Sequence, residues 1–128
     1  VYRKNGPAKA RQLGEYLGKR FGKYTHILWT MGGDNDPRSI RSEIEAMAGG
    51  LRATAPRQLI AYHANPPHSS TDLFQYAPWL GYSMIYTYWR EKPRRVDPQQ
   101  MVHVYEAALR EYNKSDRLPF ILGESQYE

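Results

Sequence analysis

Two acidic residues each follow a short apolar run and a glycine, a place from which a carboxylate can do chemistry. Asp34 closes the run 26–31 through two glycines, and Glu124 closes the run 119–122 through one. A carboxylate that leaves an apolar strand is costly to bury unless it is paired or functional. Side chains at the carboxyl ends of parallel strands gather at one edge of the sheet, so we expect both acids there.

A carboxylate pair at one strand edge suits hydrolysis of a glycosidic bond. One carboxyl group must donate a proton to the leaving oxygen, and the other must be ionised to attack or stabilise the anomeric carbon. The alternatives are a loop cap at Asp34 and a salt bridge from Glu124 to an arginine elsewhere. A calcium loop is disfavoured because residues 34–36 are not followed by the Gly and Glu of such a loop, and we expect no metal and no cofactor.

The two remaining strand ends carry residues that could hold a sugar. His63 follows the run 58–62, and Tyr88 and Trp89 close the run 82–88. An imidazole can donate to a sugar hydroxyl, and an aromatic face can stack on a sugar ring. We expect His63, Tyr88 and Trp89 to bind substrate, with a structural histidine and rim packing as the alternatives.

Apolar spacing and turn residues predict the elements that position these groups. Asn5, Asp36 and Asp97 are each candidate helix caps with a proline close behind, and Gly49-Gly50 should weaken the end of the second long helix. The last long helix should bury Met101, Val104, Tyr105, Ala108, Leu109 and Tyr112, while the second should bury Ile40, Ile44, Met47, Ala48 and Leu51. Helices are expected at about 5–21, 36–51, 71–76 and 97–113, and strands at 26–31, 58–62, 82–88 and 119–123.

This alternation predicts an α/β fold in which parallel strands alternate with helices. Crossovers should be right-handed. The 128 residues suffice for one domain, but a closed barrel of eight strand–helix units needs roughly 250. We therefore treat residues 1–128 as a single, partial domain.

Composition removes several classes of function. The chain has no Cys, which excludes disulfides, thiolate metal sites and a cysteine nucleophile. It has no apolar run long enough for a membrane span, and no GxSxG, HExxH or GxGxxG motif. The net charge is +5 with the basic residues spread along the chain, so we expect no nucleic-acid partner. Clustering on one face of Arg11, Lys19, Arg20, Lys23, Arg52 and Arg57 would favour that alternative.

Several of these segments together resemble the apiosidase-like glycoside hydrolases, a family with a (β/α)8, or TIM, barrel. The similarity runs in order through nearly the whole chain: 27–34 (ILWTMGGD), 44–48 (IEAMA), Tyr62-His63 with Ser69-Ser70, 78–80 (PWL), and Gly123-Glu124 with Tyr127-Glu128. Departures from the family pattern at Ala64, Thr87-Tyr88 and Ser125 concern the substrate more than the fold.

The resemblance implies that the chain covers about strands four to seven of the barrel. It implies that Asp34 is the general acid/base and Glu124 the nucleophile, with Glu128 as a second candidate for the strand-seven carboxylate. We add Trp29 and Glu128 to the expected substrate-binding residues. The implied substrates are branched sugars, apiose among them, in plant polysaccharide side chains, and many members are exported by bacteria. A non-catalytic carbohydrate-binding or structural remnant of the same fold is the alternative.

Overall fold

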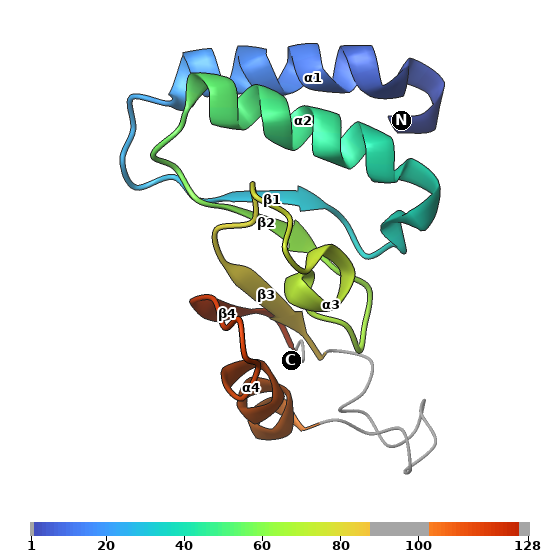
Figure 1. Ribbon diagram of the computed structural model, residues 1–128, viewed down its shortest axis with the longest axis vertical. Coiled ribbons are helices and arrows are strands. Elements are labelled where there is room, and N and C mark those ends of the chain that lie inside the picture. The colour runs from blue at the N-terminus through green and yellow to red at the C-terminus, as the bar shows by residue number, and fades with distance from the viewer. Residues whose placement is uncertain (1, 88–102, 126–128) are drawn as a thin grey trace.

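The computed structural model describes residues 2–87 and 103–125, in which helices and strands alternate as expected (Figure 1). Tyr88, Trp89 and Glu128, together with the predicted cap at Asp97, lie outside the described residues. The elements are α1 (Tyr2–Phe21), β1 (Trp29–Gly32), a 3-10 turn η1 (Pro37–Ile40), α2 (Arg41–Thr54), β2 (Ile60–His63), α3 (Ser70–Phe74), β3 (Ser83–Tyr86), α4 (Val104–Tyr112) and β4 (Phe120–Glu124).

The named strands of the described residues pair in parallel, but the ladder is interrupted between β2 and β3. β1 pairs with β2, and β3 pairs with β4, as two separate two-stranded sheets. Between β2 and β3 lies the hydroxyl of Ser70, which donates to the carbonyl of Tyr62 (2.6 Å) and accepts from the N–H of Met84 (2.9 Å). The serine thus takes the place of a direct ladder bond and satisfies both buried backbone groups. One backbone bond, from Gly81 N–H to Ile60 O at 2.8 Å, also joins the two pairs.

The paired α1 and α2 form a layer over β1 and β2 (Figure 1). Small residues let the two backbones touch: a Cβ on Gly14 would lie 2.2 Å from the carbonyl oxygen of Met47, and one on Gly50 would lie 2.3 Å from that of Arg11. The glycine pair 49–50 does not end α2, which continues to Thr54. Gly50 instead allows this close approach, a packing role that outweighs the low helix propensity of glycine.

The two N-terminal helix starts differ. Asp36 caps η1 as predicted, its side chain accepting from Arg38 N–H at 2.9 Å, with Pro37 next. In α1, however, the helix does not begin after Asn5, because residues 2–5 are already helical and the break falls at Gly6 (φ 71°). Glycine adopts this positive φ without a Cβ penalty, and Pro7 then resumes the helix.

The strands separate a helix-facing core from a second, smaller face. Successive side chains along β2 alternate, so Ile60 and Tyr62 pack with the helices while Ala61 joins a separate cluster with Tyr82 and Met84. The expected stripe of α2 supplies the helix side of the core, with Ile44, Met47, Ala48 and Leu51 buried. His63 follows Ala61 by two residues and therefore lies on the smaller face.

The buried side of α4 is not the one predicted. In the expected apolar stripe, Val104 and Ala108 are half-buried, Tyr105, Leu109 and Tyr112 are exposed, and Met101 lies outside the described residues. The fully buried residues of the helix are Ala107 and Glu111. The reason is electrostatic, since Glu111 turns inward to an ion pair with Lys114 at 2.8 Å. A paired and hydrogen-bonded carboxylate can be buried where an isolated one cannot, so the apolar period misassigned the face.

Candidate active site

The loop after β1 has an unusual backbone that presents Asp34. Gly32 (φ 86°), Gly33 (φ 150°) and Asp34 (φ 53°) all have positive φ. Glycine and aspartate are among the residues that tolerate this region best. A Cβ on Gly32 would meet the ring of Tyr62 at 2.3 Å, so only glycine fits beside that ring. The Tyr62 hydroxyl then donates to the carbonyl of Asn35 at 2.8 Å and ties the loop to β2.

A bulge at Gly123 sets the direction of Glu124. In the β3–β4 register Ile85 is opposite Leu122, but the next residue, Tyr86, is opposite Glu124, so Gly123 is skipped. A one-residue slip moves a side chain to the other face of a strand, and bulges often redirect side chains in this way. Glu124 thereby joins the face of Tyr86. Gly123 must lack a side chain, because its Cβ would lie 2.1 Å from Met84.

His63 joins the two strand ends. The backbone N–H of Asp34 donates to Nδ1 of His63 at 3.1 Å, and Nε2 of the same ring lies 3.0 Å from Oε2 of Glu124. The ring also packs edge-on against Tyr86, with centroids 5.1 Å apart. Gly32 is opposite His63 in the β1–β2 register, which explains how the loop reaches the ring. Only about a fifth of each side chain of the His63–Glu124 pair is exposed, at 18% and 20%.

The structure brings three of the expected site residues together and leaves one elsewhere. Asp34, His63 and Glu124 meet at the carboxyl ends of β1, β2 and β4. Trp29 does not join them, because it opens β1, at the opposite end of the strand. Its indole N–H donates to Gln58 at 2.6 Å and its ring lies near Phe21 on the helix side. Tyr88, Trp89 and Glu128 fall outside the described residues.

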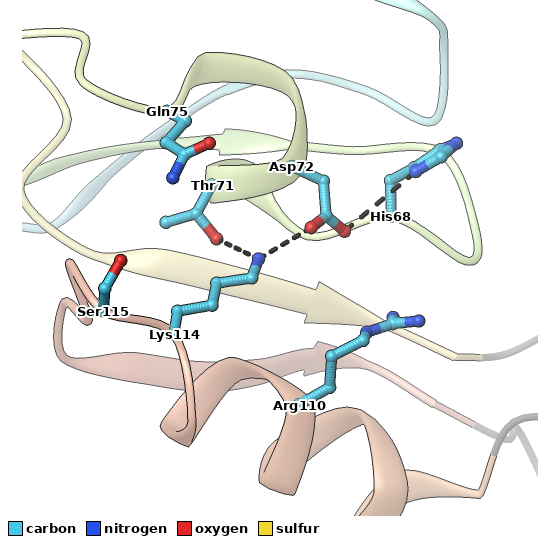
Figure 2. Close-up of a pocket in the computed structure, with 7 residues that line it drawn as sticks. All are labelled: His68, Thr71, Asp72, Gln75, Arg110, Lys114 and Ser115. Carbon is cyan, nitrogen blue, oxygen red and sulfur yellow. Dashed lines mark hydrogen bonds and ion pairs between the residues drawn. The ribbon is translucent and has the colours of Figure 1, made fainter.

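A second polar cluster joins α3 to α4 (Figure 2). Lys114 donates to Asp72 (2.6 Å) and Thr71 (2.6 Å) and pairs with Glu111 (2.8 Å), whose Oε1 accepts from the Thr71 hydroxyl. Ser69 completes the cluster by capping α3 in a reciprocal box with Asp72. An open crevice of about 600 Å³ lies beside it, lined by His68, Thr71, Asp72, Gln75, Arg110, Lys114 and Ser115.

We call Ser69, Thr71, Asp72, Glu111 and Lys114 the helix cluster. Both of its carboxylates are held in the ionised form. Burial alone would raise the pKa of Asp72, but hydrogen bonds from Lys114 and from Ser69 N–H outweigh it and hold the pKa below its ordinary value. Burial also raises the pKa of Glu111, and again Lys114, with neighbouring hydroxyl groups, brings it below the ordinary value. Every charge in the cluster has an opposite charge beside it, which is typical of a structural ion pair.

Neither this cluster nor the Gly123 bulge is predicted by the sequence. Part of the cluster does have a local sequence signal, because Ser69 and Asp72 have the spacing of a capping box. The inward turn of Glu111 has no comparable local signal.

Among residues 2–87 and 103–125, no group of three or more His, Asp or Glu side chains is arranged to hold a metal ion, and no helix is long and apolar enough to cross a bilayer.

Comparison with known proteins identifies the fold and the family. Residues 2–128 match the family described as "Apiosidase-like, catalytic domain". A crystal structure of a glycoside hydrolase family 5 protein from Bacteroides vulgatus ATCC 8482 superposes with a TM-score of 0.82 at 20% identity, over 96% of this chain and 28% of that one. A second structure, described as a glycoside hydrolase, gives 0.77 at 24% identity, over 96% and 29%. No curated protein matches significantly.

At these identities the two structures establish the fold, and the chain spans less than a third of the length of either. They align the alternating strands and helices of this chain with part of a TIM-barrel domain. The family match covers nearly every residue and is independent of those superpositions. The chain therefore belongs to the apiosidase-like family of glycoside hydrolase catalytic domains.

Proposed function

We propose that the protein hydrolyses glycosidic bonds by a retaining double displacement, with Asp34 as general acid/base and Glu124 as nucleophile. The observation that carries this proposal is the position of His63, whose two ring nitrogens lie 3.1 Å from the Asp34 backbone nitrogen and 3.0 Å from a Glu124 carboxylate oxygen. A single imidazole ring thus spans the gap between the Asp34 loop and the Glu124 carboxylate. Two carboxyl residues flanking one sugar-sized space are the requirement of this chemistry.

Each step assigns a proton and a bond to one of these groups. Protonated Asp34 donates to the leaving oxygen while ionised Glu124 attacks the anomeric carbon, which gives a covalent glycosyl-enzyme. Asp34, now ionised, takes a proton from water, and that water releases the sugar from Glu124.

We infer the substrate class from the family. Membership implies a carbohydrate substrate. Within that class we propose side chains of plant polysaccharides, with branched sugars such as apiose among the residues released. Bacterial export would suit such a substrate, and it remains a proposal that cell fractionation can test.

The test uses the full-length protein and a panel of aryl glycosides of pyranoses and furanoses, apiofuranosides included. Asp34→Asn and Glu124→Gln should each lower kcat/KM by roughly 1000-fold or more, since each removes a group that acts on the reacting bond. The matched control is Asp36→Asn, two residues from Asp34 with the same loss of charge. Asn is as good a helix cap as Asp, so this variant should keep its activity within a few-fold of wild type.

Two outcomes would count against the proposal. Full activity in either Asp34→Asn or Glu124→Gln would remove that residue from its role. Carbohydrate binding without turnover of any glycoside in the wild-type protein would instead support a non-catalytic carbohydrate-binding module, the alternative that the sequence left open.

A further inference from the structure

The hydrogen bonds of His63 determine which of its nitrogens carries the proton. A backbone N–H can only donate, so Nδ1, which lies 3.1 Å from the nitrogen of Asp34, must be the unprotonated acceptor. A neutral imidazole has one donor and one acceptor, and the proton is therefore on Nε2. Nε2 lies 3.0 Å from Oε2 of Glu124, so the ring donates to that carboxylate.

We propose that His63 is a positioning residue for Glu124 and links its carboxylate to the Asp34 loop. This inference rests on the proposed glycosidase function. With Nδ1 accepting from Asp34 and Nε2 donating to Glu124, both polar atoms of the ring are engaged. The ring keeps no N–H for a sugar hydroxyl, so the role differs from the substrate contact expected from sequence.

The surroundings of the ring suit a fixed support. His63 is the last residue of β2, and its backbone is held in register with Gly32 of β1. Its ring rests edge-on against Tyr86, a buried residue that is itself opposite Glu124 across the β3–β4 ladder. Partial burial of both His63 and Glu124 makes their hydrogen bond stronger than it would be in water.

The same strand holds the loop at a second point. Tyr62 donates to Asn35 O at 2.8 Å, one residue beyond the Asp34 N–H that reaches His63. Consecutive residues of β2 therefore hold consecutive residues of the loop, and one of them also holds Glu124.

Two substitutions of His63 each keep one of the two hydrogen bonds of the ring and remove the other. The amide nitrogen of Gln has about the reach of Nε2, so His63→Gln keeps a donor for Glu124 and loses the acceptor for Asp34 N–H. The amide oxygen of Asn has about the position of Nδ1, so His63→Asn keeps that acceptor and cannot reach Glu124. His63→Ala loses both.

For the full-length protein we expect His63→Asn and His63→Ala to lower kcat about 100-fold, as small misplacements of a reacting group do, with KM changed by less than about three-fold. His63→Gln should recover kcat to within about ten-fold of wild type. Thermal unfolding of all three variants identifies any that fail to fold. A rise in KM at unchanged kcat, or equal kcat losses in His63→Gln and His63→Asn with both folded, would overturn the proposal.

A second measurement does not depend on turnover. In protein labelled with nitrogen-15 at histidine, the His63 signals, assigned by their absence in His63→Gln, should show a proton on Nε2 and a lone pair on Nδ1. The Nε2 signal should shift in Glu124→Gln. A proton on Nδ1 would contradict the proposal even if the protein hydrolyses glycosides. If no glycoside were hydrolysed, a protonated Nε2 that responds to Glu124→Gln would still support the link while the proposed function failed.

Discussion

Two clusters of carboxylates lie in the described part of this chain, and they are built in opposite ways. Between α3 and α4, Glu111 and Asp72 are paired with the ammonium group of Lys114. At the strand ends, Glu124 accepts a hydrogen bond from Nε2 of His63, and Nδ1 of the same ring accepts from the Asp34 N–H. A carboxylate that is paired with a cation contributes to the stability of the fold. A carboxylate that accepts a hydrogen bond from a ring anchored to a neighbouring strand is oriented for reaction with an electrophilic carbon.

The backbones of the two regions also differ, because one is regular and the other is not. The helix cluster rests on regular helices, with a capping box at Ser69. The strand-end site needs three consecutive residues with positive φ and a bulge at Gly123. Backbone conformations of this kind cost free energy and concentrate at functional sites. We therefore expect substitutions in the helix cluster to change stability, and substitutions at the strand ends to change activity.

The largest change in stability is expected from Lys114→Met. It leaves Glu111, which is 2% exposed, without its cation, and breaking a buried pair in this way costs about 3–5 kcal/mol of unfolding free energy. Urea unfolding of the full-length protein measures the loss, with Lys9→Met on the exposed side of α1 as the control. Activity per folded molecule should not change. A fall in kcat with stability intact would erase the distinction between the two clusters.

A smaller loss of stability and a larger loss of activity are expected from Gly123→Ala. The new methyl group would overlap Met84, and overpacking of this kind costs about 1–3 kcal/mol. Relief of the overlap would shift the bulge and misdirect Glu124, so kcat should fall by about 100-fold. The control is Gly49→Ala, whose methyl group would meet only the flexible end of Arg11. Wild-type kcat in Gly123→Ala would show that the bulge does not set the direction of Glu124.

The smallest expected effect is a dependence of stability on pH. The pKa values of Asp72 and Glu111 are lowered in the folded state from ordinary values of 3.8 and 4.5. Their stabilisation is therefore complete above those ordinary values and is lost as pH falls through the lower folded values. Unfolding free energies measured from pH 6 downward should decrease in wild type and decrease less steeply in Asp72→Asn. Equal slopes would show that Asp72 does not contribute to the acid sensitivity.

Local sequence patterns were enough to predict the elements and their order. The Asp36-Pro37 start and the apolar stripe of α2 are confirmed, because capping and helical burial are decided by residues close in the chain. The parallel strands that alternate with helices are also confirmed. Strand limits were less accurate, since β1 begins at Trp29, where Ile60 of β2 provides a partner.

Features that depend on contacts distant in sequence were not predicted. Ser70 interrupts the ladder because its hydroxyl reaches both Tyr62 O and Met84 N–H, and no local pattern encodes that bridge. Glu111 turns inward because Lys114 and Thr71 meet it there, against the apolar period of its helix. For the site, sequence identified Asp34, Glu124 and His63 as strand-end residues. The connection that His63 makes between the other two appears only in three dimensions.

The most direct test of the central claim is to trap the glycosyl-enzyme. The full-length protein would be incubated with an activated 2-deoxy-2-fluoro analogue of a glycoside that it cleaves, then digested and analysed by mass spectrometry. We predict one covalent sugar on the peptide that contains Glu124, located at that residue by fragmentation, and none in Glu124→Gln. A sugar attached to Glu128 or to any other residue, with Glu124 unmodified, would contradict the account.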